Sequence, residues 1–231
     1  MRSFFAGAML LATVASTATA QTVTAVDGPD PLTSNALFSA QTNVVDFTNC
    51  GVPSGVVITG GACQTSSSSG NWAQPWQSYS GGGFYTTMAP YPGSTVTVDF
   101  SGWLANNAFS SVQSLSLYWG SIDSYQKLEL LDGGGNVIST IFGSSVASPS
   151  ANGDQSFPGT NRRVNIDFGP TGSSTFAGLR FTSDQAAFEF DDIAIAAVSG
   201  AQVVPEPSTY ALMAAGLAGL FGVARRRKQN G

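Results

Sequence analysis

Histidine is absent from this chain of 231 residues, and charged residues make up only 10% of it. The absence of histidine excludes Ser-His-Asp and Cys-His catalytic triads, histidine-ligated zinc and the usual proton shuttle near neutral pH. With so little charge, solubility must depend on the abundant Ser, Thr and Gly residues, a composition common among secreted β proteins. No catalytic constellation is visible, so we expect a protein that is not an enzyme and needs no cofactor.

The N-terminal residues have the pattern of a secretory signal peptide over residues 1–20. Arg2 supplies the positive charge, and a short apolar stretch follows it. Ala18 and Ala20 form the small-x-small cleavage site, which would leave Gln21 as the new N-terminus. An uncleaved membrane helix is the alternative, but the apolar stretch is short for one. The pattern therefore predicts Sec-dependent export.

The C-terminus carries three parts in a fixed order. The first is Pro205-Glu206-Pro207-Ser208, whose prolines favour an extended, accessible segment. Residues 209–224 follow without a charge. This stretch is slightly shorter than the roughly 17–25 residues of a spanning helix, but it can cross a bilayer together with its flanking residues. The cations Arg225, Arg226, Arg227 and Lys228 come last and should stay cytoplasmic, so a transmembrane helix with the body outside is predicted.

This order of motifs resembles the PEP-CTERM protein-sorting signal, here over residues 205–228 with a linker at 199–204 before it. The resemblance implies recognition by an exosortase, a membrane transpeptidase-like enzyme of Gram-negative bacteria that also make extracellular polysaccharide. It implies an inner-membrane intermediate, cleavage near the Pro-Glu-Pro, and transfer of the ectodomain to the cell surface or extracellular matrix. A plain C-terminal anchor is the alternative, but such an anchor has no need of the Pro-Glu-Pro.

The body between the two ends, residues 21–204, is long enough for one domain with a sizeable core. It keeps four cations (Lys127, Arg162, Arg163 and Arg180) against thirteen acids, a net charge near −9, whereas the whole chain has −5. Such acidity argues against nucleic acid and anionic membranes as partners of the body. It is compatible with binding divalent cations.

Cys50 and Cys63 are the two cysteines of the chain. Export takes them to an oxidising compartment, where a disulfide is the expected state. The bond would close a loop of about 14 residues and contribute about 3 kcal/mol in the chain-entropy model. It would also hold a Gly-rich connection, residues 51–61. The spacing fits neither a Cys-x-x-Cys pair nor a zinc site.

Short stretches of alternating apolar and polar residues follow one another for about 150 residues. Val96, Val98 and Phe100 share one face of a predicted strand, and Leu115, Leu117 and Trp119 share one face of another, opposite Ser114, Ser116 and Tyr118. A hairpin with a Gly-rich loop is predicted at 132–136. The expected strands are 42–48, 55–59, 84–88, 94–100, 112–119, 126–131, 137–142, 163–168, 176–182 and 188–195.

This pattern predicts an all-β fold, a jelly-roll-like antiparallel β-sandwich over residues 41–198. A closed barrel is the alternative. Residues 21–40 form either a loose lead-in or a short edge strand, and no amphipathic helix is evident between the two ends. Gly/Ser-rich connections around 60–83 and 144–160 are expected to be loops at the ends of the sandwich.

The last predicted strand changes phase, because Phe188 and Phe190 share one parity while Ile193 and Ile195 share the other. Keeping all four in the core requires one extra residue, so we place a β-bulge at residues 191–192. Such a bulge would turn both carboxylates there toward the rim of the sheet.

The bulge creates an acidic corner formed by Asp46, Glu189, Asp191 and Asp192. The first and last strands of a jelly roll are often neighbours, which would bring Asp46 close to the others. Hard oxygen ligands on a loop or bulge suit calcium, which takes about six to eight oxygens. A solvated acidic edge that discourages strand-to-strand aggregation is the alternative.

A second candidate site is the aromatic loop at 71–79, with Trp72, Trp76 and Tyr79 beside amide side chains. Exposed aromatic faces next to amides are what a sugar-binding platform needs. The same side chains are also suited to packing over one end of the sandwich. Both interpretations stay open.

The third stretch is Trp119-Gly120-Ser121-Ile122-Asp123-Ser124-Tyr125. Together with the Phe-Asp-Asp-Ile run at 190–193 it resembles the ectodomain of a family of exosortase-dependent surface proteins. That family is described by sorting, so the resemblance implies no catalytic residue. In physical terms Gly120 allows a sharp exit from the strand, and Asp123 can cap the turn through its side chain.

These observations predict an exported, exosortase-sorted surface or matrix protein with a non-catalytic role, linked to exopolysaccharide or biofilm. A carbohydrate-binding module is the first alternative, with exopolysaccharide as its partner. A glycan-cleaving enzyme is the second, because retaining glycosidases need only two carboxylates about 5–5.5 Å apart. The available carboxylates are Asp99, Asp123, Glu129 and Asp167, and nothing in the sequence brings a pair together.

Overall fold

The computed structural model describes residues 21–27, 41–77, 83–87, 94–185 and 187–200. Residues 1–199 form one compact unit and residues 200–231 a second one, and all the described residues except Gly200 belong to the first. The strands are β1 (Thr22–Asp27), β2 (Thr42–Val45), β3 (Val57–Thr59), β4 (Ala62–Gln64), β5 (Phe84–Thr86), β6 (Ser94–Asp99), β7 (Phe109–Gly120), β8 (Gln126–Asp132), β9 (Val137–Phe142), β10 (Arg162–Asp167), β11 (Phe176–Ser183) and β12 (Glu189–Ser199). The helical segments are η2 (Thr48–Cys50), α1 (Ser101–Asn106), α2 (Gly143–Val146) and η3 (Pro158–Thr160).

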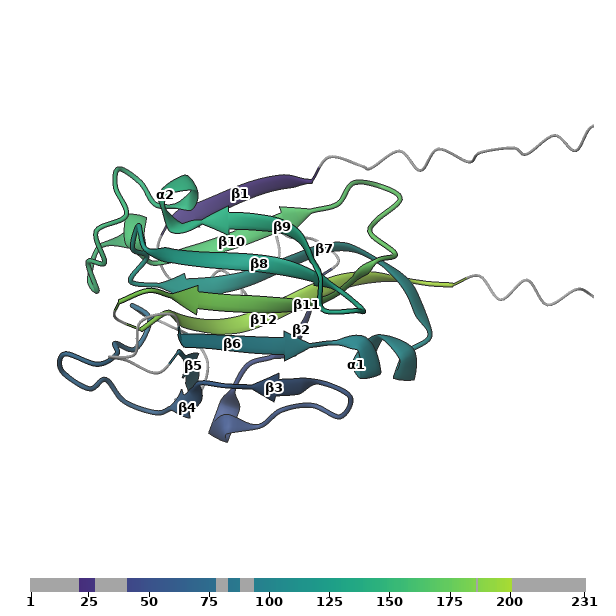
Figure 1. Ribbon diagram of the computed structural model, residues 1–231, viewed down its shortest axis with the longest axis horizontal. Helices are drawn as coiled ribbons and strands as arrows, with labels where there is room; N and C mark the ends of the chain where they lie inside the picture. The colour runs from purple at the N-terminus through teal and green to yellow at the C-terminus, as the bar shows by residue number, and fades with distance from the viewer. Residues whose placement is uncertain (1–20, 28–40, 78–82, 88–93, 186, 201–231) are drawn as a thin grey trace, which may run out of the picture. The chain divides into compact units, whose positions relative to one another are not determined.

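The strands form two antiparallel sheets (Figure 1). The seven-stranded sheet has the order β1-β10-β7-β12-β5-β4, with β2 also paired to β12, and the five-stranded sheet has the order β3-β6-β11-β8-β9. From β5 to β12 the chain passes between the sheets in the sequence of a jelly roll. The predicted all-β jelly-roll sandwich is confirmed. The described strands leave open edges in both sheets, so the barrel alternative is wrong.

The core lies between the two sheets and consists of side chains of one parity from each strand. The side chains predicted to face inward on β6 and β7 are fully buried: Val96, Val98, Phe100, Leu115, Leu117 and Trp119. Across the core the rings of Phe181 and Phe190 stack with centroids 3.7 Å apart. The Trp119 indole N–H donates to Gln126 Oε1 at 2.8 Å, so its burial leaves no unpaired donor.

All the strands expected from alternation are present, with ends that differ by a few residues. Within the predicted lead-in, β1 pairs with β10, so the edge-strand alternative holds there. Several short elements are absent from the sequence-based prediction, among them β4 and α1. β4 has three residues in a Gly/Ser-rich stretch, and α1 has six, too few to display a helical period. α1 has no buried residue, so it is not the amphipathic helix whose absence the sequence indicated.

The predicted bulge lies where the phase of β12 changes. Asp191 pairs with Tyr118 and Ala194 pairs with Ser116, so one extra residue is inserted in β12. Asp192 takes a left-handed φ of 47°, and the four apolar residues around the bulge are all buried. The expected exposure of the carboxylates is wrong, because Asp191 and Asp192 are 0% and 1% exposed. The bulge turns them under covering chain instead of toward the rim.

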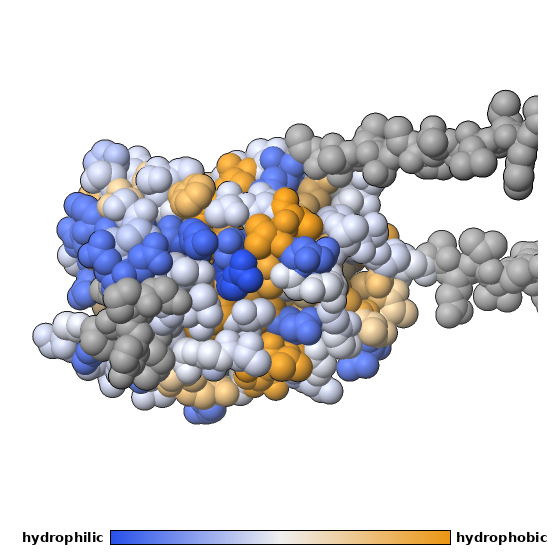
Figure 2. Space-filling view, in the orientation of Figure 1, coloured by the Kyte–Doolittle hydropathy of each residue, from blue (hydrophilic) through white to orange (hydrophobic). Residues whose placement is uncertain are grey.

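The outer face of the five-stranded sheet is open to solvent, as its alternation predicts. Thr95 and Asp99 on β6 are exposed. Figure 2, viewed toward this sheet, shows apolar and polar residues mixed over the face. Exposed apolar side chains there include Val57 on β3, and Ile138 and Phe142 on β9.

The outer face of the seven-stranded sheet is covered around β7, whereas Thr24 on β1 and Asp167 on β10 are exposed toward the edge. Ser116 and Tyr118 on β7 have the predicted outward parity, but both are fully buried. The Ser116 hydroxyl donates to Gln41 Oε1 at 2.5 Å, and the Tyr118 hydroxyl donates to the carbonyl of Trp76. Gln41, just before β2, and Trp76, between β4 and β5, therefore lie over this part of the sheet.

Cys50 and Cys63 form the predicted disulfide, with Cα atoms 5.7 Å apart. The bond joins η2 to β4, and the loop it closes contains β3. Because β2 and β4 belong to the seven-stranded sheet and β3 to the five-stranded sheet, the disulfide holds a segment that crosses between the sheets and returns.

Candidate functional site

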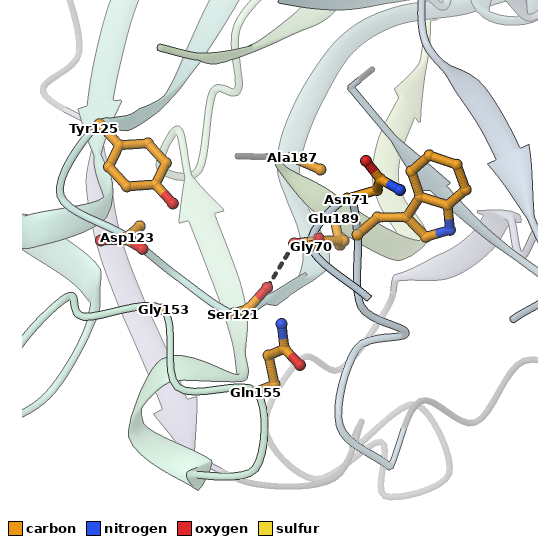
Figure 3. A pocket seen from close by; sticks show the side chains of 10 residues that line it. Gly70, Asn71, Ser121, Asp123, Tyr125, Gly153, Gln155, Ala187 and Glu189 are labelled. Carbon is orange, nitrogen blue, oxygen red and sulfur yellow. Dashed lines mark hydrogen bonds between the residues drawn. The ribbon is translucent and has the colours of Figure 1, made fainter. Parts of the chain in front are cut away.

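A pocket of about 130 Å³ opens at one end of the sandwich (Figure 3). Its walls come from the loop before β5, the turn between β7 and β8, the loop before β10, and the start of β12. Both Gly/Ser-rich loops that the sequence places at the sandwich ends therefore meet at the same end. The pocket is lined by the aromatic side chains of Trp72 and Tyr125 and by the polar side chains of Asn71, Asp123, Gln155 and Glu189.

Glu189, the first residue of β12, lies in the floor of this pocket and is 2% exposed. Its Oε1 accepts the Ala73 N–H at 2.9 Å, and its Oε2 accepts the Ser121 hydroxyl at 2.5 Å (Figure 3). Burial raises the pKa of Glu189 to about 8, more than these hydrogen bonds lower it, and the nearby Asp123 carboxylate adds to the rise. At neutral pH Glu189 is therefore mostly a neutral carboxylic acid.

The turn after β7 positions Ser121 beneath this carboxyl group. Gly120 ends the strand, and a Cβ there would lie 2.8 Å from the Cβ of Pro75, so the close approach of the covering loop requires glycine. The sharp change of backbone direction occurs one residue later, because Ser121 has a left-handed φ of 38°. Such strain in a residue other than glycine is often found at functional sites. The expectation that Gly120 supplies the turn is corrected to this extent.

Asp123 is held at the side of the pocket by the turn and by the loop before β10. Its Oδ1 accepts the N–H of Ser124 at 3.1 Å, so the predicted capping role is confirmed. Its own N–H donates to Gln126 Oε1 at 2.9 Å. Gly153 packs directly against the carboxylate, since a Cβ there would lie 2.3 Å from Asp123 Oδ2.

The described residues of the aromatic loop support both interpretations that the sequence leaves open, a sugar-binding platform for one residue and packing over the sandwich for another. Trp72 is half-buried and lines the pocket, as a binding platform would require. Trp76 lies over the seven-stranded sheet and is held there by its backbone. Its backbone N–H donates to Asn161 Oδ1 at 3.1 Å, and its carbonyl accepts a hydrogen bond from the Tyr118 hydroxyl. Tyr79 lies outside the described residues. Of the three aromatic residues, Trp72 alone is brought to the pocket among those described.

The four residues of the predicted acidic corner are not brought together as one site. Glu189 belongs to the pocket, whereas Asp191 and Asp192 are buried at the bulge. Asp46 is exposed, and its Oδ1 accepts the N–H of Thr48 at 3.0 Å. Within the described ranges no group of three or more acidic or cysteine side chains is arranged to hold a metal ion. The calcium hypothesis stays a prediction without geometric support.

The arrangement offers hydrogen-bonding groups and aromatic surface around a small open hollow. The sequence singled out Trp72 in the aromatic loop, Asp123 in the stretch after β7 and Glu189 in the acidic corner, which are three separate contexts. It did not indicate that Glu189 pairs with Ser121, 68 residues away, or that Gln155 joins the same pocket. The available signals were the unusual Gly-Ser exit of β7 and the two Gly-rich loops, and neither specifies its partner.

Comparison with known proteins identifies the segment that follows the sandwich at the C-terminus. Residues 203–228 match the model of the PEP-CTERM protein-sorting motif. The motif predicted from Pro205, Glu206 and Pro207 is thereby confirmed. It supports an exported protein that an exosortase processes and that is sorted to the cell envelope or surface. The resemblance of the ectodomain to other exosortase-dependent surface proteins stays a prediction.

The sandwich itself has little likeness to characterised proteins. No curated protein matches the chain. Among solved structures, the enzymatically active domain of Bacteriophage CBA120 tailspike protein 4 matches with 12% identity and a TM-score of 0.32, over 77% of this chain and 19% of that one. A likeness at this level carries no argument about activity.

The N-terminal and C-terminal segments with the predicted export and sorting signals lie outside the described residues. These are the signal peptide with its cleavage site, the sorting residues 205–208, the helix at 209–224 and the basic cluster at 225–228. Within the part of the chain that is described, no helix combines the length and apolar character needed to span a bilayer.

Proposed function

We propose that this protein acts at the cell surface or in the extracellular matrix of a Gram-negative bacterium, by binding and not by catalysis. An exosortase releases its ectodomain from an inner-membrane intermediate, and the sandwich then becomes a component of the envelope or of the exopolysaccharide of a biofilm. The observation that carries the proposal is the PEP-CTERM motif at residues 203–228, at the end of a chain that begins like a signal peptide.

The state of the pocket carboxyl groups supports a role without catalysis. A retaining glycosidase needs two carboxyl groups about 5–5.5 Å apart that both reach the scissile bond. Glu189 is almost completely buried, and both of its oxygens accept hydrogen bonds from the fold. It would have to release Ala73 and Ser121 before it could serve a substrate.

The three candidate carboxylates outside the pocket are also engaged by the fold. Glu129 Oε2 accepts from Arg180 Nε at 2.7 Å. Asp99 Oδ1 accepts the N–H of Ser101 at 2.8 Å, and Asp167 Oδ1 accepts the N–H of Gly169 at 2.6 Å. These contacts favour structural roles for all three side chains.

The test is the intact mass and cell fraction of the protein in its host, with and without the exosortase. We expect a species that begins near Gln21, ends near residues 205–208 and occurs in the surface or matrix fraction. Deletion of the exosortase should leave the C-terminal segment attached and the protein in the inner membrane. A full-length protein that stays in the inner membrane in both strains would contradict the proposal.

A further inference from the structure

The pocket lies at the end of the sandwich opposite the one where the chain leaves for its C-terminal segment. β12 pairs with β7 so that Glu189 faces Gly120 at one end and Ser199 faces Phe109 at the other. At about 3.3 Å per residue, the eleven residues of β12 place the pocket floor roughly 35 Å from this exit. The described chain also enters β1 from the exit end (Figure 1).

We propose that this pocket binds the terminal sugar of a glycan that carries no acidic group. The inference rests on the proposed function and names the partner of the same surface protein. It assigns the pocket to one sugar unit presented from outside and not to a chain lying along a sheet.

The size of the pocket indicates a single small unit. Pockets for drug-sized ligands commonly enclose about 300–1,000 Å³. The volume here is about 130 Å³, and it opens to solvent between loops. A hollow of this size at a sandwich end can accept one ring from an approaching chain end, whereas an internal segment would need an open groove on both sides.

A sugar ring has apolar C–H faces and polar hydroxyl groups, and the pocket lining offers a surface that matches each of them. Half-buried Trp72 and Tyr125 offer flat apolar faces to the C–H groups of a ring. The Trp72 indole N–H donates to the carbonyl of Ser66 at 3.1 Å, which fixes the ring in its loop. The amides of Asn71 and Gln155 both donate and accept hydrogen bonds, as hydroxyl groups require. Figure 3 shows Asn71 on the opposite side of the pocket from Tyr125.

Charge sets the selectivity of the pocket. Its lining includes Asp123 and Glu189 but no lysine or arginine. The carboxylate of Asp123 can accept hydrogen bonds from neighbouring hydroxyls or from an amine. A uronate or phosphate would place a second negative charge there without a cation to balance it, which is unfavourable in a partly enclosed site. Neutral and amino sugars therefore fit, and acidic sugars do not.

The pocket is held in shape before any ligand arrives. Glu189 joins the loop at Ala73 to the turn at Ser121 through its two oxygens. The N–H of Gly153 donates to the carbonyl of Ile122 at 3.0 Å, which ties the loop before β10 to the same turn. Such preorganisation lowers the ordering cost of binding.

The experiment uses the mature protein purified from the surface fraction of its host. It is applied to an array of glycans that end in neutral hexoses, amino sugars or uronic acids, and the best ligand is then titrated by calorimetry. We expect binding of neutral or amino-sugar ends and none of uronate ends. Trp72→Ala and Gln155→Ala should each weaken binding by about tenfold or more. Gly153→Ala, which inserts a Cβ against the Asp123 carboxylate, should weaken it as well.

Matched variants at the opposite end provide the control. Trp103, in α1, packs against Phe109 with ring centroids 5.3 Å apart, and Gln113 Nε2 donates to the Pro170 carbonyl at 3.3 Å. Trp103→Ala and Gln113→Ala should leave glycan affinity unchanged, provided that melting curves show each variant to be folded. Equal losses at both ends would overturn the proposal.

Three further results would also overturn it: no binding to any array member, equal binding of uronate ends, or release of free sugar from a bound glycan. The proposed function fails separately. A correctly processed protein in the matrix that binds no glycan leaves sorting intact and rejects the pocket assignment. A protein that is never processed rejects the surface role, while glycan binding by the purified chain would still support the pocket.

Discussion

The outer faces of the two sheets have the same alternating sequence pattern but opposite surroundings. On the five-stranded sheet, Glu129 Oε2 accepts from Arg180 Nε at 2.7 Å, and the Arg180 side chain is 32% exposed. On the seven-stranded sheet, Arg163 and Glu189 are 1% and 2% exposed. Arg163 Nε and Nη2 both donate to the Ser116 hydroxyl, at 3.1 and 2.9 Å. The pair on the five-stranded sheet thus keeps its arginine partly in water over a nearly buried Glu129, whereas Arg163 and Glu189 both lie under covering chain.

The two glutamates record this difference in their pKa values. The hydrogen bond from Arg180 lowers the pKa of Glu129, and Lys127 lowers it further. Burial raises the pKa of Glu189 to about 8. Alternation of polar residues therefore specifies which face of a sheet a side chain occupies, whereas the covering loops decide whether that face behaves as surface or interior. The pocket lies where this covering layer ends.

The largest expected effect is a dependence of stability on pH that only the covered face produces. Unfolding returns Glu189 to a pKa near 4.5, so the folded state holds an extra proton between about pH 4.5 and 8. Unfolding free energy should therefore fall as pH rises through this window, by at most roughly 1.4 kcal/mol per pH unit and on the order of 4 kcal/mol in total. Urea unfolding at several pH values measures it.

Two matched variants test this dependence of unfolding free energy on pH. Glu189→Gln should remove most of the fall between pH 4.5 and 8, and Glu129→Gln should leave it unchanged. Groups with lowered pKa values, such as Glu129, lose their stabilising contribution only as pH falls toward 4, outside the window. The chain contains no histidine, so no imidazole contributes between pH 5 and 8. An unchanged slope in Glu189→Gln would show that the covered face does not control the pH response.

A somewhat smaller effect is expected when the arginines of the two faces are truncated. Arg163→Ala removes a fully buried side chain and its hydrogen bonds to Ser116, and should lower the unfolding free energy by roughly 3.5 kcal/mol. Arg180→Ala removes one of the two cations that pair with the nearly buried Glu129 but leaves Lys127 in place, and should cost about 1 kcal/mol. Equal losses in the two variants, measured by urea unfolding at pH 6, would remove the energetic basis of the comparison.

The smallest of the three effects concerns the crossing between the sheets. Reduction of Cys50–Cys63, or the double change Cys50→Ala and Cys63→Ala, should lower the unfolding free energy by about 3 kcal/mol, because the unfolded chain regains the entropy that the bond removes. Thiol labelling of the exported protein without reductant should find no free thiol. Stoichiometric labelling would mean that the segment around β3 is held without this link in the mature protein.

Much of the sandwich was predictable because strand geometry is local. Period-two alternation identified the strands and the inward faces of β6 and β7, and the parity change around Asp191 and Asp192 located the bulge without knowledge of its neighbours. The short elements β4 and α1 escaped, since three and six residues are too few to establish a period. The number and spacing of the strands suggested the jelly-roll class, whereas the strand order within each sheet came only from the structure.

The sequence by itself determined how this protein is sorted and how its strands face the core. It indicated the PEP-CTERM motif at 203–228, the disulfide, the two-sheet core and the inward parity of the strands. Only the tertiary structure decided that Tyr118 and Asp191 are buried, and that Ser121 meets Glu189 across 68 residues. The physical reason is that alternation encodes a direction relative to one sheet. Burial, pKa and the pocket depend on where long loops settle, and that is set by contacts between segments distant in the chain.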